Sequence, residues 1–179
     1  MLRRAPQAAA VAVVVGLLGL LVWDLAHQSG GKVAKQVDAG KIVPAPPFTR
    51  PRIDTNGTLS LVSLRGKVVV LNFWQSYCQP CTREARTLVA ASQRWSEKDV
   101  VFVGVDELDF KSAARKFMKR FGVTYATISD NGPLVGHYGV TGYPETFFVD
   151  RHGRVVPPHI VGPVTHESVD AAIRRVRAL

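Results

Sequence analysis

From residue 68 onward, apolar residues follow two distinct periods along the chain. Residues 68–73, in which only Asn72 is polar, and 100–105 are apolar runs, which are typical of buried parallel strands. After each run, apolar residues recur at every third or fourth position, as on one face of an amphipathic helix. Strands and helices therefore alternate, and the pattern predicts an α/β domain. The other expected elements are helices at 110–121, at 133–138 and after Thr165, and strands at 125–129, 146–150 and 155–161, the last at a sheet edge because of its prolines.

The start of the chain is apolar without any polar face. Residues 5–23 contain no charged residue, and residues 8–23 are almost purely Ala, Val, Leu and Gly. At about 1.5 Å per residue, such a helix spans close to the roughly 30 Å hydrocarbon core of a bilayer. Arg3 and Arg4 precede it, so the positive-inside rule predicts a cytoplasmic N-terminus and an extracytoplasmic remainder. We expect residues 1–27 to be a single-pass anchor in the cell membrane; a cleaved secretory signal is the alternative and delivers the domain to the same side.

The segment that follows reads as a connection to a folded domain. Residues 28–42 are polar, contain glycine and show no period, which predicts an extracytoplasmic linker. A proline-rich stretch at 44–47 stiffens the entry to a domain that we expect to cover residues 43–179. Asn56-Gly57 lies between apolar positions and indicates a β-hairpin.

Charge and ligand counts exclude several classes of function. The formal net charge is +9 at pH 7, yet no basic patch with interleaved aromatic residues stands out. We therefore expect no nucleic-acid partner and interpret the charge as a solvated basic surface beside an anionic membrane. The chain has two cysteines and five histidines, without the paired spacing of a four-ligand zinc site. We predict neither a metal nor a cofactor.

The two cysteines, Cys78 and Cys81, lie between a predicted strand and the start of a predicted helix. A thiol at a helix N-terminus feels the positive end of the helix dipole, which lowers its pKa. A second thiol one turn into the helix can then resolve a mixed disulfide. A purely structural disulfide is disfavoured, because so short a loop removes little chain entropy. The pattern predicts a redox centre in which Cys78 is the nucleophile and Cys81 the resolving thiol.

Two further features could belong to this centre. Glu84 lies near one helical turn after Cys81, where a partly buried carboxylate could transfer protons; a solvated glutamate favoured by the helix dipole is the alternative. Gly142-Tyr143-Pro144-Glu145-Thr146 immediately precedes a predicted strand. The bond before Pro144 can be cis at modest cost, although a plain turn fits the local sequence equally well.

Motifs around these residues resemble a known family. Phe-Trp-Gln-Ser-Tyr-Cys-Gln-Pro-Cys at 73–81, with the later Gly-Tyr-Pro-Glu-Thr-Phe-Phe-Val-Asp, resembles the thioredoxin superfamily. Residues 46–48, 61–67 and 138–146 are similar to the membrane-anchored TlpA/ResA/CcmG (DsbE) thiol–disulfide oxidoreductases. The resemblance implies a thioredoxin-like fold: a central mixed sheet flanked by helices, with a strand and a helix inserted between the CxxC helix and a cis-proline.

The resemblance also assigns roles to residues. It implies that Pro144 is cis and packs against the disulfide, that the backbone of Tyr143 pairs with a substrate chain, and that Glu84 assists proton transfer. Asn72 stands where thioredoxin has a buried aspartate, and Tyr77 replaces the tryptophan that usually precedes the first cysteine. The residues between the cysteines also differ from several members, which leaves the direction of electron flow open. The expected substrate-binding residues are Trp74, Tyr77, Tyr143, Pro144 and Glu145, the last shaping the partner groove.

Together these inferences predict an extracytoplasmic thiol–disulfide oxidoreductase. The resemblance implies a protein-disulfide reductase of cytochrome c maturation, acting on apocytochrome c or on an assembly protein. A membrane thiol reductant of the DsbD/CcdA type would supply electrons, and the protein would be a monomer. The rival functions are a disulfide oxidant for exported proteins, a thiol peroxidase, and a module that binds a partner without catalysis.

Overall fold

The computed structural model describes residues 13–20 and 33–179. Two units are distinguished, one ending at Gly31 and the other beginning at Lys32. In the first unit, residues 13–20 are helical. None of the helices in the described ranges is long and apolar enough to cross a bilayer. Most of the expected anchor over 1–27 lies outside the described residues, so the anchor and its cleaved alternative stay predictions.

A six-stranded mixed sheet is the centre of the second unit. Its strand β4 is buried along its whole length, which explains its apolar run. Strand β4 pairs in parallel with β5 and antiparallel with β7. Across the sheet the strands are β1 (Val43–Pro44), β8 (Arg154–Val161), β7 (Glu145–Val149), β4 (Val68–Trp74), β5 (Val100–Glu107) and β6 (Ala126–Asp130).

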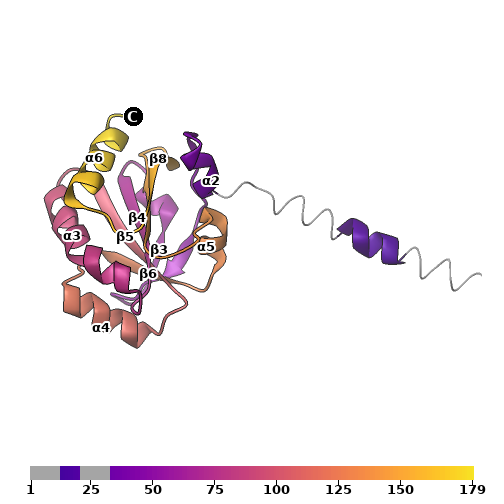
Figure 1. Cartoon of the computed structure of the whole chain (residues 1–179), viewed down its shortest axis with the longest axis horizontal. Coiled ribbons are helices and arrows are strands. Elements are labelled where there is room, and N and C mark those ends of the chain that lie inside the picture. The colour runs from indigo at the N-terminus through magenta and orange to yellow at the C-terminus, as the bar shows by residue number, and fades with distance from the viewer. Residues whose placement is uncertain (1–12, 21–32) are drawn as a thin grey trace, which may run out of the picture. The chain divides into compact units, whose positions relative to one another are not determined.

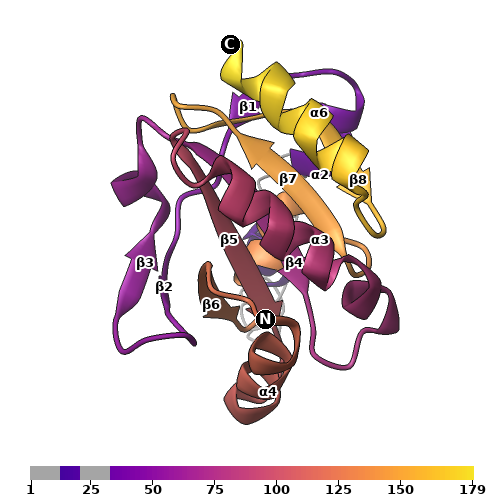
Figure 2. The same cartoon turned by 90° about the vertical axis from the view of Figure 1, so that its left-hand side faces the viewer.

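Helices cover both faces of the sheet, and the alternation along β4 shows which face is which (Figures 1 and 2). Val68 and Val70 belong to an apolar cluster with α3 and α6, whereas Val69 and Leu71 belong to one with α2 and α5. Helix α4 packs beside α3. The helices are α2 (Val33–Asp38), α3 (Gln79–Trp95), α4 (Lys111–Phe121), α5 (Pro133–Tyr138) and α6 (His166–Arg177), and a hairpin of β2 (Thr49–Pro51) and β3 (Thr58–Ser60) is followed by a 3-10 turn (Leu61–Leu64).

Most predicted elements are confirmed, some to the residue. Helix α5 has its predicted bounds, and Thr165 caps α6 by accepting a hydrogen bond from the Ser168 backbone N–H. The Asn56-Gly57 signal does mark a hairpin. The predicted edge strand, β8, is partly covered, because Pro44 and Val43 of β1 pair with its first two residues. The two prolines of β8 lie beyond that short pairing and, on the other side, at an irregularity in the β7–β8 register, so the sheet tolerates them.

The linker expected over 28–42 is not wholly irregular. Residues 33–38 form helix α2, whose Val33, Ala34 and Val37 are buried, and α2 packs against β8. Six residues are too few to display a helical period, so the polar composition of the segment hid the helix. The folded unit therefore begins about a helix earlier than the domain boundary predicted at residue 43.

The order of elements is that of a thioredoxin-like fold. Between α3 and Pro144 the chain forms β5, α4, β6 and α5. Strand β6 and helix α5 are the strand and helix inserted before the cis-proline that the resemblance implied. The C-terminal end of β4, the start of α3 and the loop before β7 meet at one end of the central strands. The cysteines lie at this meeting point.

Candidate active site

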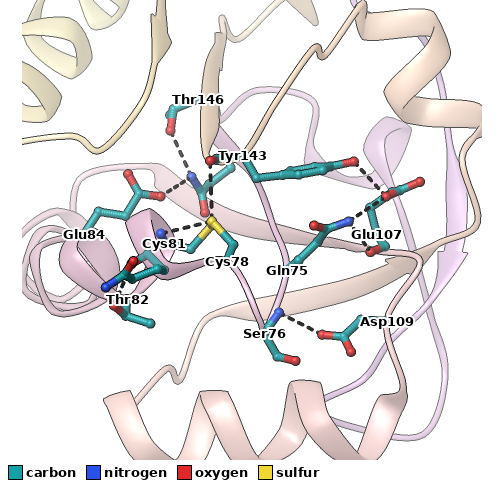
Figure 3. The surroundings of a disulfide bond; sticks show 12 residues. Gln75, Ser76, Cys78, Cys81, Thr82, Glu84, Glu107, Asp109, Tyr143 and Thr146 are labelled. Carbon is teal, nitrogen blue, oxygen red and sulfur yellow. Dashed lines mark hydrogen bonds between the residues drawn. A yellow bond between two sulfur atoms is a disulfide. The ribbon is translucent and has the colours of Figure 1, made fainter.

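The two cysteines form a disulfide at the N-terminus of α3 (Figure 3). Cys78 is the N-cap of the helix, and its Sγ accepts a hydrogen bond from the Cys81 backbone N–H at 3.1 Å. This N–H and the helix dipole would stabilise a thiolate on Cys78 after reduction. Cys78 is 9% exposed and Cys81 only 1%, so Cys78 is the more accessible of the two.

The loop before β7 forms the opposite wall of the disulfide. The Tyr143–Pro144 peptide is cis, as the resemblance implied. The Tyr143 carbonyl oxygen lies 3.4 Å from Cys78 Sγ. A carbonyl at this position can accept a hydrogen bond from the reduced Cys78 thiol.

Glu84 lies beneath the disulfide rather than in solvent, so the alternative of a solvated helix-start glutamate is wrong. Its side chain is 1% exposed. Oε1 accepts a hydrogen bond from Asn72 Nδ2, and Oε2 accepts one from the Val164 backbone N–H, both at 2.8 Å. Burial outweighs these two donors and raises the pKa of Glu84 to about 7. Glu84 and Cys81 line one small cavity of about 10 Å³, close to the space that one water needs.

Three of the expected substrate-binding residues, Trp74, Pro144 and Glu145, are buried. Glu145 is fully buried, and its Oε1 accepts hydrogen bonds from the backbone N–H groups of Thr141 and Gly142. It therefore shapes the Tyr143–Pro144 loop from below instead of touching a partner. Trp74 is also buried, stacked on Phe117 with ring centroids 4.5 Å apart. Tyr77, by contrast, is 68% exposed beside Cys78 and is free to contact a substrate.

His159 of β8 connects this loop to α2. Nothing in the spacing of residues along the sequence indicated this link. Its ring stacks on Phe147, its Nε2 lies 2.9 Å from Glu145 Oε2, and its Nδ1 lies 3.1 Å from Asp38 Oδ1. Carboxylates only accept hydrogen bonds, so two such partners require the doubly protonated imidazolium. Burial opposes that charge, but the two carboxylates outweigh it and raise the pKa of His159. Burial also opposes the negative charge of Glu145. The hydrogen bonds from His159, Thr141 and Gly142 outweigh it and lower the pKa of Glu145.

Replacing His159 with Phe should destabilise the fold in a pH-dependent way. The variant keeps the stack on Phe147 but leaves the buried Glu145 carboxylate without its cation, at a cost of about 2 to 4 kcal/mol near pH 6. The pair stabilises the fold above the unfolded pKa of Glu145 and below that of His159. Its contribution is lost as the pH rises through the folded pKa of His159 or falls through that of Glu145. Urea unfolding at pH 6 and pH 9 measures this: the gap to wild type should shrink at pH 9, and a constant gap would contradict the ion pair. Asp38→Asn, which removes only the exposed partner, is the control and should cost less than about 1 kcal/mol.

A group of acidic residues at the end of β5 accepts hydrogen bonds from the segment before Cys78 and from Tyr143. Glu107 accepts hydrogen bonds from Gln75 Nε2 at 3.1 Å and from the Tyr143 hydroxyl at 2.7 Å. Asp109 accepts one from the Ser76 backbone N–H at 2.8 Å (Figure 3). A signal was present in the sequence: acidic residues directly follow a central strand parallel to the one that leads to the cysteines, and such strand ends share one edge of a sheet.

Asp106, which belongs to this group, is buried and accepts no hydrogen bond from a described residue. Neither of its carboxylate oxygens meets a hydrogen-bond donor within the described part of the chain. Burial, and then the neighbouring carboxylates of Asp109 and Glu107, raise the pKa of Asp106 to about 8. The protonated acid therefore persists at neutral pH, where it can donate a hydrogen bond to Asp109.

Asp106→Asn should stabilise the protein in mild alkali, because an amide donates to Asp109 as the protonated acid does. The stability that the raised pKa gives is complete at acid pH and is lost as the pH rises through the folded value near 8. We expect the variant to be more stable than wild type by about 3 kcal/mol or more at pH 9 and nearly equal at pH 4, close to the unfolded pKa. Urea titrations measure both, with Asp99→Asn on the exposed surface as control. A variant less stable than wild type at pH 9 would rule out the protonated pair.

Comparison with known proteins places the chain in a family. The sequence pattern of the AhpC/TSA family matches residues 43–157. The chain belongs to this thioredoxin-like family. The thiol–disulfide oxidoreductase ResA of Bacillus thuringiensis (strain Al Hakam) is 30% identical over 119 residues, which cover 66% of this chain and 68% of ResA.

Solved structures agree with this membership. A thiol:disulfide interchange protein of the thioredoxin family from Chlorobium tepidum TLS has a TM-score of 0.69 at 27% identity, covering 76% of this chain and 97% of that one. A secreted Mycobacterium tuberculosis disulfide oxidoreductase homologous to E. coli DsbE has a TM-score of 0.62 at 26% identity, covering 74% and 96%. With the Cys78–Cys81 disulfide, these relatives identify the chain as a thiol–disulfide oxidoreductase of the ResA/DsbE type.

Proposed function

We propose that this AhpC/TSA-family protein is a disulfide reductase that acts in cytochrome c maturation outside the cytoplasm. The observation that carries the proposal is that the more accessible cysteine faces the cis-proline loop while the deeper one lines a cavity with a buried carboxyl group. Cys78 faces the Tyr143 carbonyl, while Cys81 shares its cavity with Glu84. Such a dithiol is arranged for two sequential attacks.

In the first step, the Cys78 thiolate attacks one sulfur of a partner disulfide. A bond forms between Cys78 Sγ and that sulfur, and the partner's other sulfur leaves as a thiolate. Tyr77 and the backbone of Tyr143 form the surface against which the partner chain lies in this step, and the buried Pro144 holds that backbone in place. In the second step, Cys81 transfers its proton to Glu84 and attacks Cys78 Sγ. The internal disulfide forms, and the partner's second thiolate leaves and takes up a proton.

The remaining parts of the proposal are the partners and the location. Apocytochrome c, or a protein that assembles it, is the proposed disulfide substrate, and a membrane thiol reductant of the DsbD/CcdA type regenerates the dithiol. The apolar segment within residues 1–27 would anchor a monomeric protein, with its catalytic domain on the extracytoplasmic side. The resemblance in the motifs around Cys78 and Pro144 and the named ResA and DsbE-type relatives support this assignment.

The reduction potential tests the direction of exchange. We expect a value near that of thioredoxin, about −270 mV, rather than that of DsbA, about −120 mV. Equilibration with glutathione buffers, followed by thiol counting, measures it. A potential near that of DsbA would favour the rival role as an oxidant. Failure of the reduced protein to reduce a disulfide in the haem-attachment sequence of apocytochrome c would contradict the proposed substrate.

A further inference from the structure

A groove between α3 and α4 opens beside the disulfide. Its volume is about 240 Å³, and we call it the α3–α4 groove. Ser76 lies just before the cysteine pair and Thr82 directly after Cys81, so two of the lining residues flank the disulfide in the chain (Figure 3). Its lining residues are Ser76, Thr82, Ala113, Lys116, Phe117 and Arg120.

The position of α4 explains why two cations reach this groove. Phe117 stacks on Trp74 at the end of β4, and this contact fixes one face of α4 toward α3. Ala113, Lys116 and Arg120 lie on the same helical face, at spacings of three and four residues. Because Phe117 is buried and Lys116 and Arg120 are exposed, the charged groups stand at the rim above an apolar floor.

The groove is positively charged. Helix α4 contains five basic residues and no acidic residue in the sequence KSAARKFMKRF. Neither Lys116 nor Arg120 forms a salt bridge with any described residue, although the Arg120 guanidinium lies over the Phe121 ring. The N-terminus of α3 adds the positive end of its dipole. The nearby Asp109 carboxylate is already bonded to the Ser76 N–H, and it lines a different cavity together with Arg50 and Lys111.

We propose that the α3–α4 groove binds acidic side chains of the polypeptide whose disulfide Cys78 attacks. This rests on the proposed reductase function and adds a preference to it: partners with Asp or Glu close to the disulfide react faster. A polypeptide is favoured over a lipid surface because Ser76 and Thr82, which flank the cysteines in the chain, line the groove, so a polypeptide that presents its disulfide to Cys78 lies within reach of the two cations. Tyr77, which directly precedes Cys78 in the chain, is itself exposed. Because the charges of Lys116 and Arg120 are exposed, they act mainly by attracting the acidic partner before contact, which raises the association rate constant.

Two disulfide-bridged peptides test the preference. They differ only in the residues that flank the bridge, aspartates in one and asparagines in the other. The rate constant for their reduction by the reduced full-length protein is measured at low and at high ionic strength. We expect the acidic peptide to react about tenfold faster at low salt, and the two rates to converge at high salt because exposed charges are screened. Lys116→Gln combined with Arg120→Gln should bring the two rates within about twofold even at low salt.

A matched control removes the same charge elsewhere. Arg174 and Arg175 are exposed on α6, and the variant with both changed to Gln should keep the tenfold preference. Loss of the preference in this control as well would overturn the proposal, because overall charge would then explain the effect. Binding of anionic lipid vesicles through Lys116 and Arg120, without any preference between the peptides, would also overturn it in favour of a membrane surface.

Hydroxyethyl disulfide, which is small and uncharged, separates failure of this proposal from failure of the proposed function. If the wild-type dithiol does not reduce it, the reductive role itself fails. If wild type reduces it but treats the two peptides alike, the reductase remains and only the groove assignment is overturned.

Discussion

Cys78→Ser should reduce protein disulfides no faster than buffer alone, whereas Cys81→Ser should stop halfway and accumulate mixed disulfides. The asymmetry follows from the geometry. Only Cys78 approaches the surface beside the Tyr143 carbonyl, so without its sulfur no bond to a partner forms. Without Cys81 the first bond still forms, but no thiol lies beneath it to break that bond. Non-reducing electrophoresis of cell extracts measures the trapped adducts, and mass spectrometry identifies the trapped proteins.

The double variant with both cysteines changed to Ser is the control, and it should trap nothing. Adducts that form through Cys81 when Cys78 is absent would contradict the assignment of roles. If the adducts held by Cys81→Ser contain no cytochrome c protein and no cytochrome c assembly factor, the proposed substrate class is wrong while the exchange chemistry stands.

Glu84→Gln should slow the release of the partner by about 10²-fold near pH 7. The carboxyl group has a pKa raised to about 7, so a substantial fraction is ionised at neutral pH and can take the Cys81 proton within their shared cavity. Wild type should therefore accelerate as the pH rises through 7. The variant should recover only in alkali, where hydroxide removes the Cys81 proton without help from a carboxylate. Stopped-flow tryptophan fluorescence at a series of pH values measures the profile.

A surface substitution and a stability measurement separate this effect from misfolding. Glu97→Gln changes an exposed carboxyl group just after the C-terminus of α3 and should leave the pH profile unchanged. The amide that Glu84→Gln introduces would present a donor to one of the two N–H groups that now face the carboxylate, so unfolding must also be measured. A folded Glu84→Gln variant with the wild-type pH profile would remove the proton-transfer role.

The parts of the site that could be predicted from sequence are those whose chemistry is local. Cys78 and Cys81 are separated by one helical turn, and the strand before them and the helix after them each have their own period. Glu84 could be proposed for the same reason, but its burial depends on Asn72 in β4 and on Val164 before α6, which only the folded chain brings together. The sequence therefore indicated the acid and could not choose between its buried and solvated forms.

Residues whose role depends on tertiary contacts were misplaced or missed. Trp74 and Glu145 adjoin the site in sequence, which suggested contact with a partner, yet both point into the protein. Sequence proximity does not reveal which side of a strand end or loop a side chain takes. Asp106 and His159 were missed for the converse reason, since their significance comes from neighbours on other strands and helices rather than from spacing along the chain.

The contact between Asp38 and His159 bears on where this protein can be shortened. The family match begins at residue 43, so a fragment cut by homology would omit α2 and with it one of the two carboxylates on the His159 ring. Without Asp38, only Glu145 accepts a hydrogen bond from the His159 ring. The neutral imidazole can donate that one bond, so His159 would lose its proton more readily. Since Glu145 also fixes the loop that carries Tyr143 and Pro144, thiol titrations and potentials measured on such a fragment would describe an altered active site. A faithful soluble form should begin before Val33.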